Sequence, residues 1–204
     1  MSVRRIYLVR HGETAYNAAR ILQTPEIPLS PRGERQAAAL GARLAGRGIG
    51  RVLASDLARA VGTAERVCAA TGASLELDPL LQERSFGALR GTPWAALGFD
   101  PFAADYAPPE GETWAAFHAR VDRAWQSVRA VAARTHGSLA VVTHGLVCAS
   151  LASRHLRLPA DADLRRGFAN TSLTEIEPAP PFAVAVFNCT AHLALEASRE
   201  SGPV

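Results

Sequence analysis

Two arginines and two histidines fall where buried strands are expected to end. In the stretch YLVRHGETAYN, which begins at residue 7, Arg10 and His11 directly follow a run of apolar residues. Arg59 lies one helical turn beyond a second apolar segment, RVLAS, and His144 ends a third, SLAVVTH. Because ligands of open α/β sheets bind at the carboxyl ends of the strands, these four side chains are expected to share one pocket.

This combination of residue types suits the chemistry of a phosphoryl group. Arginine keeps its charge and presents a planar fork of donors that matches phosphate oxygens. The amides that open the helix after His144, from Gly145 onward, would add further donors for the same anion. His11 can then act as the nucleophile through one ring nitrogen while the backbone holds the other. Gly12 is interpreted as a residue that lets the chain turn sharply and bring its backbone close to the imidazole.

A leaving alkoxide needs a proton, and Glu83 in LQERSFG is the candidate donor. It follows an apolar segment and precedes an irregular region, so its carboxyl group can face the same pocket. The structural alternative is a surface salt bridge between Glu83 and Arg84. The residues alone leave these two interpretations open.

Apolar and helical patterns predict the elements that position these residues. Strands are expected at residues 5–9, 51–55, 74–77 and 138–144, and later ones near 172–177, 182–188 and 191–195. Helices are expected at 13–19, 30–48 with Ser30 as N-cap and Pro31 in the first turn, 57–71, 112–136 and 145–156. The alternation of strand and helix indicates an α/β fold with a largely parallel sheet, to which the late strands add antiparallel edges.

Length and composition predict one soluble domain. The 204 residues show no repeat or linker, so residues 1–204 are expected to form a single domain, with an irregular lid at about 84–113. The basic residues are all arginine and are scattered along the chain, so no nucleic-acid partner is expected. No apolar stretch approaches the ~20 residues of a membrane span. With no signal peptide at its amino terminus, the chain is expected to be cytoplasmic.

Possible zinc ligands occur in two pairs, His144 with Cys148 and Cys189 with His192. His144 is already required by the phosphate pocket, and the second pair fits an ordinary strand or turn. We therefore expect no metal. No other cofactor is expected either, because arginine and histidine meet the phosphate charge.

Four motifs, in this order, resemble those of the histidine phosphatase superfamily, which contains cofactor-dependent phosphoglycerate mutases and broad-specificity phosphatases. They are RHGET at 10–14, SDLARAVGTAE at 55–65, LLQERSFGALRG at 80–91 and VVTHG at 141–145. The resemblance implies a phosphoglycerate mutase-like, three-layer α/β sandwich and a phosphohistidine intermediate on His11. Arg10, Arg59 and His144 would form the phosphate pocket, and Glu83 would be the general acid and later the base that activates water.

The same resemblance implies roles for three more residues. Asn17, in ETAYN, and Gln23 would reach the phosphate, although the loop LQTPEIPLS is one residue shorter than usual and lacks its glycine. Glu112, in PPEGETW, resembles the GGES element of the phosphatase branch and is expected to support the site from behind.

A phosphatase is expected rather than a mutase. In mutases the stretch between the acidic motif and the second histidine motif resembles a longer insertion with several basic residues. Here residues 91–119 hold no lysine or arginine, and a lid without positive charge suits a small, highly anionic substrate poorly. Its large apolar residues, which pack on the sheet or form a wall for the leaving group, are Trp94, Leu97, Phe99, Phe102, Tyr106 and Trp114.

The expected function is therefore metal-independent hydrolysis of a small phosphorylated metabolite. The alternatives are phosphoglycerate mutase-type phosphoryl transfer and a phospho-ligand binding protein that has lost catalysis. A homo-oligomer is possible, and the sequence does not identify the substrate.

Overall fold

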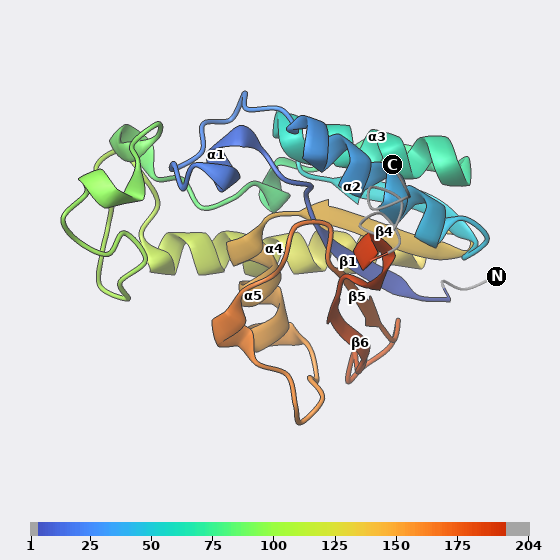
Figure 1. The fold of residues 1–204 in the computed structure, drawn as a ribbon. Coiled ribbons are helices and arrows are strands. Elements are labelled where there is room, and N and C mark those ends of the chain that lie inside the picture. The colour runs from blue at the N-terminus through green and yellow to red at the C-terminus, as the bar shows by residue number, and fades with distance from the viewer. Residues whose placement is uncertain (1–3, 195–204) are drawn as a thin grey trace, which may run out of the picture.

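A six-stranded sheet forms the centre of the structure, a computed structural model that describes residues 4–194 (Figure 1). Its strands are β1 (Ile6–Arg10), β2 (Ile49–Ala54), β3 (Ser74–Leu77), β4 (Ser138–Thr143), β5 (Leu173–Ile176) and β6 (Val184–Cys189). Their order is β3-β2-β4-β1-β5-β6, in which the first four are parallel to one another. β5 runs antiparallel to β1, and β6 runs antiparallel to β5. A mostly parallel sheet with an antiparallel edge is confirmed.

Helices cover both faces of this sheet and complete three layers (Figure 1). They are α1 (Ala15–Ala18), α2 (Pro31–Leu44), α3 (Ala58–Thr71), α4 (Trp114–Ala133) and α5 (Gly145–His155). Successive side chains of a strand point to opposite faces. In β1, Tyr7 and Val9 accordingly pack with α2 and α3, while Ile6 and Leu8 pack with α4 and α5. The predicted three-layer sandwich is therefore confirmed.

The start of α2 follows the predicted capping chemistry. Ser30 accepts a hydrogen bond from the amide of Gly33 at 3.0 Å, and Pro31 occupies the first helical position. The side chains on the apolar face are buried as expected, namely Ala37, Leu40, Gly41 and Leu44. This helix ends four residues earlier than the pattern indicated, because Gly46 and Gly48 adopt a left-handed backbone.

The irregular segment between β3 and α4 lies at the same end of the molecule as α1 (Figure 1). Residues 84–113 hold two 3₁₀-helical turns, η2 (Gly87–Leu89) and η3 (Trp94–Ala96), joined by loops. Backbone hydrogen bonds tie this segment to the chain after α1: Leu22 N donates to Thr92 O at 3.0 Å, and Trp94 N donates to Arg20 O at 2.9 Å. The segment is thus held over the carboxyl ends of the parallel strands.

The expected strand at 191–195 is wrong. Residues 191–194 form a helical turn, and residue 195 lies outside the described residues. Asn188, near the end of β6, has a left-handed backbone with a φ of 47°, so the chain turns away from the sheet. His192 then points inward, with Nε2 3.2 Å from the hydroxyl of Thr171.

Candidate active site

The pairing of β1 with β4 brings the two histidine motifs together. Arg10 is aligned with Thr143 in this parallel register, and the amide of His11 donates to the Thr143 carbonyl at 2.9 Å. The next residue on each strand is a histidine, and the rings of His11 and His144 lie 5.1 Å apart. Both histidines are almost fully buried, at 2% and 0% exposure.

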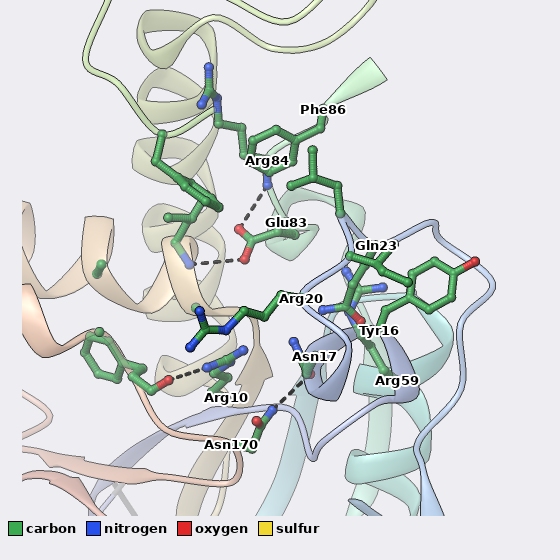
Figure 2. A pocket seen from close by; sticks show the side chains of 18 of the residues that line it. Arg10, Tyr16, Asn17, Arg20, Gln23, Arg59, Glu83, Arg84, Phe86 and Asn170 are labelled. Atoms are coloured by element: carbon green, nitrogen blue, oxygen red, sulfur yellow. Dashed lines mark hydrogen bonds between the residues drawn. The ribbon is translucent and has the colours of Figure 1, made fainter. Parts of the chain in front are cut away.

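A cavity of about 680 Å³ opens at the carboxyl ends of the parallel strands (Figure 2). Arg10 at the end of β1, Arg59 in the first turn of α3 and Glu83 in the loop after η1 (Pro79–Leu81) all line it. His11 and His144 do not line the cavity, but the charges of Arg10 and Arg59 act on both rings. The five residues expected to carry the chemistry are therefore close together, although they are far apart in the chain. A cavity of this volume holds a phosphoryl group with a sizeable leaving group.

The His11 ring is fixed with one nitrogen available. Its Nδ1 lies 2.7 Å from the carbonyl oxygen of Gly12, which can only accept, so Nδ1 carries the hydrogen and Nε2 keeps its lone pair. Burial lowers the pKa of His11 well below its ordinary value, and the charges of Arg59 and Arg10 lower it further. The imidazole is thus neutral at neutral pH, as a nucleophile must be.

The backbone of Gly12 lies close to the imidazole as expected, since its carbonyl oxygen is 2.7 Å from His11 Nδ1. The φ of Gly12 lies outside the left-handed range, so this approach needs no backbone conformation special to glycine. A Cβ at this position would instead stand 2.7 Å from the carbonyl oxygen of Gly33 in α2. The amide of Gly12 also donates to Thr63 Oγ1 at 3.0 Å. Glycine therefore allows the histidine loop to lie directly against α2 and α3.

Three site residues present buried donor atoms without partners. These atoms are Arg10 Nε, Arg59 Nε and His144 Nδ1, half of the six unpartnered buried side-chain nitrogen and oxygen atoms in the described part of the chain. Buried polar groups are nearly always hydrogen-bonded, and an anion would satisfy all three at once. The arrangement is that of an anion site.

The two arginines are anchored at their other nitrogens. Arg10 donates to the carbonyl of Phe168, and Arg59 donates to that of Thr24 at 3.1 Å. Burial lowers the pKa of Arg10, and it lowers that of Arg59 to about 10, partly offset in both by the charge of Glu83. Both guanidinium groups remain charged at neutral pH.

His144 is held by Ser55 at the end of β2. Its Nε2 lies 2.8 Å from Ser55 Oγ, and that oxygen also accepts the amide of Leu57 at 3.3 Å. Burial lowers the pKa of His144 well below its ordinary value, followed by the charge of Arg59. A neutral His144 with its Nδ1 unpartnered therefore lies beside the anion site.

Asn17 and Gln23 both line the cavity (Figure 2). Asn17 Oδ1 accepts from Thr14 N at 3.2 Å and from Asn170 Nδ2 at 3.3 Å, which leaves its amide hydrogens for a ligand. Gln23 Oε1 accepts from Thr14 Oγ1 at 2.8 Å. Asn170 also donates to the carbonyl of His11 at 3.0 Å, and sequence reasoning missed it. Its only signal was the segment ANTSLTEIE, which follows the four motifs.

Glu83 faces the cavity as a carboxyl group with a raised pKa. Burial is the main cause, opposed by backbone bonds from Leu146 N at 3.1 Å and Arg84 N at 3.0 Å and by the charges of Arg59 and Arg10. The amide of Leu146, near the start of α5, therefore donates to Glu83, although it was expected to donate to the anion. Gly145 lines the cavity, and a Cβ added at this position would stand 3.5 Å from Arg10 Nε.

The alternative salt bridge between Glu83 and the Arg84 side chain is wrong. The Arg84 guanidinium donates instead to the carbonyls of Glu112, Pro101 and Tyr106, and it stacks 4.0 Å from the ring of Trp114. Arg84 thus holds the irregular segment together, while only its backbone contacts the Glu83 carboxylate.

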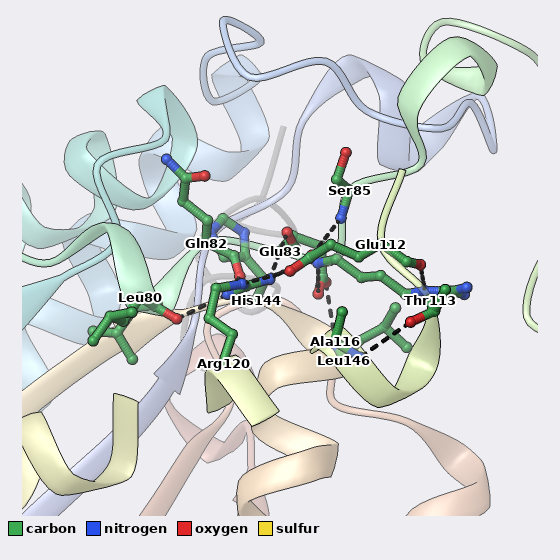
Figure 3. Close-up of polar contacts among 12 residues, drawn as sticks. Leu80, Gln82, Glu83, Ser85, Glu112, Thr113, Ala116, Arg120, His144 and Leu146 are labelled. Atoms are coloured by element: carbon green, nitrogen blue, oxygen red, sulfur yellow. Dashed lines mark hydrogen bonds and ion pairs between the residues drawn. The ribbon is translucent and has the colours of Figure 1, made fainter. Parts of the chain in front are cut away.

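Glu112 does not line the cavity. It contacts the loop that carries Glu83 (Figure 3). Its carboxylate accepts two bonds of 2.7 Å from Arg120 and one of 2.9 Å from the amide of Ser85. Burial alone would raise the pKa of Glu112, but the bonds from Arg120 and Ser85 bring it below its ordinary value.

Arg120, on α4, completes this support and was missed in the sequence. It donates to the carbonyls of Leu80 at 2.8 Å, Gln82 at 2.7 Å and Glu83 at 3.3 Å (Figure 3). Glu112 and Arg120 together fix the backbone on both sides of Glu83. An arginine within a long helix gives no signal for such a role.

The walls of the cavity differ in part from expectation. Of the six large apolar residues expected in or beside the lid, Trp94 and Phe102 line it, together with Phe86. Residues 91–119 contribute no arginine to the cavity, but exposed arginines from elsewhere in the chain line it. These are Arg20, Arg90, Arg165 and Arg166, called here the outer arginines.

The alternative zinc pairs do not converge. Within residues 4–194, no three His, Cys, Asp or Glu side chains lie close enough to hold a metal ion. Cys189 instead accepts from Arg43 Nη2 at 3.2 Å. None of the helices in the described part of the chain is both long and apolar enough to cross a membrane.

Comparisons with known proteins extend over most of the chain. The family model of the histidine phosphatase superfamily (branch 1) matches residues 6–188. The probable phosphoglycerate mutase GpmB of Erwinia tasmaniensis is 33% identical over 183 residues, which cover 85% of this chain and 84% of that protein.

Solved structures share the fold as well. A putative alpha-ribazole-5'-P phosphatase from Escherichia coli is similar with a TM-score of 0.80 and 27% identity, covering 93% of this chain and 98% of the other. A mycobacterial glucosyl-3-phosphoglycerate phosphatase solved with VO3 has a TM-score of 0.77 and 27% identity, covering 91% and 99%. The similarity therefore includes proteins described as phosphatases and proteins described as mutases.

Proposed function

Because the chain belongs to the histidine phosphatase superfamily, we propose that it hydrolyses a small phosphomonoester through a phosphohistidine on His11, without a metal ion. The observation that carries the proposal is the set of three unpartnered donors on Arg10, Arg59 and His144 beside a neutral, anchored His11. Donors in fixed positions stabilise the charge that a phosphoryl group spreads over its oxygens during transfer.

The first half of the reaction uses both His11 and Glu83. The lone pair of His11 Nε2 forms a bond to phosphorus as the bond from phosphorus to the ester oxygen breaks. Glu83, whose pKa is raised by burial, donates its proton to the leaving oxygen, so that a neutral alcohol departs.

The second half returns both residues to their starting state. The Glu83 carboxylate takes a proton from water as the water oxygen attacks the phosphorus of phosphohistidine. The bond to His11 Nε2 breaks, inorganic phosphate is released, and Glu83 is again protonated. Asn17, with its amide hydrogens free, and Gln23 are proposed to hold phosphate oxygens in both steps.

Mutase-type transfer is the second candidate, in which a second alcohol replaces water as the acceptor. A relative described as a probable phosphoglycerate mutase and the outer arginines favour it. The solved structures described as phosphatases, which match nearly their full length, favour hydrolysis. The two reactions share the phosphohistidine step.

The test compares the wild type with His11→Ala and with His136→Ala, which changes an exposed histidine outside the cavity. We expect the wild type and His136→Ala to release equal amounts of phenol and inorganic phosphate from phenyl phosphate in excess chelator. We expect His11→Ala to release neither. Activity retained by His11→Ala would exclude His11 as the nucleophile. Phenol released in excess over phosphate, with the phosphoryl group found on an added alcohol, would favour the transferase.

A further inference from the structure

The cavity holds far more positive charge than one phosphoryl group requires. Seven arginines line it, while Glu83 is its only lining carboxylate within the described residues. Arg10 and Arg59 face the phosphoryl site and together balance a phosphate dianion. Arg84 is occupied by three backbone carbonyls. The charge that is left belongs to the outer arginines, Arg20, Arg90, Arg165 and Arg166.

The outer arginines come from three separate segments and are exposed to solvent. Arg165 and Arg166 lie in the turn η4 (Leu164–Arg166), with side chains 91% and 85% exposed. Arg20 follows α1, and Arg90 ends η2. Because these segments are far apart in the chain, the fold and not the local sequence brings their positive charges together at the cavity.

Few carboxylates compensate this charge. Asp163 pairs with Arg165 at 2.9 Å and with Arg166 at 3.6 Å, so one carboxylate serves two guanidinium groups. Arg90 donates to the hydroxyl of Ser85 at 3.2 Å. Across residues 4–194, neither Arg20 nor Arg90 forms an ion pair. Like charges gathered around a concave opening attract an anion there.

The backbone that carries these arginines is fixed. Arg20 has a left-handed φ of 51°, which a residue other than glycine adopts rarely. This conformation is held by the bond from Trp94 N to Arg20 O, and beside it Gly91 N donates to Leu22 O at 2.7 Å. On the other side of the opening, Phe168 follows η4 and its carbonyl accepts from Arg10. The opening is therefore connected to the phosphoryl site itself.

Apolar side chains share the cavity with the two groups of arginines. They include Trp94, Phe102, Phe86 and Leu146. A ligand with an apolar or ring-shaped body and an anion at each end would match this lining.

We infer that the leaving group of the substrate carries a second anionic group, a carboxylate or another phosphate, which binds the outer arginines. This inference rests on the proposed phosphatase function and adds the class of substrate. Arginine recognises either anion through the same paired hydrogen bonds.

The experiment uses aryl phosphates that differ only at the para position, bearing hydrogen, carboxamide, carboxylate or a second phosphate. We expect kcat/KM for the carboxylate or the bisphosphate to exceed that for the neutral carboxamide by about tenfold, one well-formed charged contact. The carboxamide matches the carboxylate in size but withdraws more electron density, so its phenol is the better leaving group. A higher kcat/KM for the carboxylate therefore cannot be explained by the leaving group.

The variant Arg165→Gln/Arg166→Gln is expected to remove most of this preference, measured as the ratio of kcat/KM for the carboxylate to that for the carboxamide. The control variant, Arg66→Gln/Arg123→Gln, removes the same charge from exposed positions outside the cavity and is expected to retain the preference. Equal kcat/KM for carboxylate, bisphosphate and carboxamide with active enzyme would overturn the inference and leave the phosphatase standing. A preference lost equally in both double variants would also overturn it, since long-range charge would then suffice. If the enzyme cleaves none of the four esters, the phosphatase itself fails.

Discussion

Ser55 donates its hydroxyl hydrogen to Nε2 of His144, across 2.8 Å in the buried part of the site. Ser55 Oγ accepts the amide of Leu57, and among the described residues His144 Nε2 is the one acceptor within reach of its own hydroxyl hydrogen, so we assign the hydrogen to this bond. Because Nε2 then accepts, the neutral ring carries its hydrogen on Nδ1, the atom that has no partner. Ser55 thus selects the tautomer that turns a donor toward the proposed phosphate.

Replacing Ser55 with alanine is expected to lower kcat/KM for phenyl phosphate by roughly 10–100-fold, because His144 loses its fixed tautomer. The inhibition constant of inorganic phosphate is expected to rise, since the same donor binds the product. Ser55→Thr, which keeps the hydroxyl, is the matched control and should restore both values. If Ser55→Ala binds phosphate as tightly as the wild type, Ser55 has no part in orienting His144.

Arg120→Met is expected to lower kcat by about tenfold, because the carbonyls around Glu83 lose their common donor. Arg123→Met, an exposed change on the same helix, should be neutral. The decisive measurement combines Arg120→Met with Glu83→Gln. Residues that act as one unit are not additive, so the double variant should be little slower than Glu83→Gln alone. Full additivity would mean that Arg120 acts independently of the acid.

The pH dependence of kcat is expected to depend on the leaving group. Glu83 must be protonated to act as an acid, and burial raises its pKa, so turnover of an alkyl phosphate should persist above the ordinary range of a glutamate and fall as pH rises further. An aryl phosphate with a strongly acidic phenol needs no proton and should show no such fall. Glu83→Gln should abolish alkyl phosphate turnover. On the activated ester it should spare the first step alone, giving a rapid burst of phenol followed by slow turnover, because the base for the attacking water is lost. A fall of equal size for both esters would assign the titration to another group.

Stability is expected to decrease in acid between about pH 6.5 and 5. The pKa values of His11 and His144 are lowered well below 6.5, and that of His192 is lowered to about 4, in each case chiefly by burial. In this window the unfolded chain binds these protons and the folded chain does not, so unfolding is favoured as pH falls. The raised pKa of Glu83 makes the folded state bind more of its proton than the unfolded chain does, which opposes the trend by at most one proton. The expected net slope is about 1–2 kcal/mol per pH unit.

Urea unfolding at a series of pH values measures this slope. His192→Gln lies outside the cavity and is expected to reduce the slope while activity is retained. A free energy of unfolding that stays constant through the window would show that these histidines titrate normally in the folded protein.

The sequence predicted those site residues that directly follow a strand. Arg10, His11 and His144 directly follow apolar runs, so their meeting at one edge of a parallel sheet required only the order of the elements. Arg120 and Asn170 could not be predicted, because packing alone brings their partners close: backbone carbonyls and the Glu112 carboxylate for Arg120, and a carbonyl and the Asn17 amide for Asn170. The outer arginines could not be predicted for the same reason. Residues 91–119 hold no arginine, and three segments outside that range bring Arg20, Arg90, Arg165 and Arg166 to the cavity.

The parallel pairing of β1 with β4 also has a consequence for folding. The nucleophile and the second histidine belong to adjacent strands, yet residues 11 and 144 stand at opposite ends of most of the chain. Contacts between such distant segments form late, after the entropy of closing a long loop has been overcome. Recovery of activity after dilution from urea should therefore follow the formation of the central sheet and lag behind the return of helical signal. Activity during refolding therefore measures how much of the protein has completed the pairing of β1 with β4.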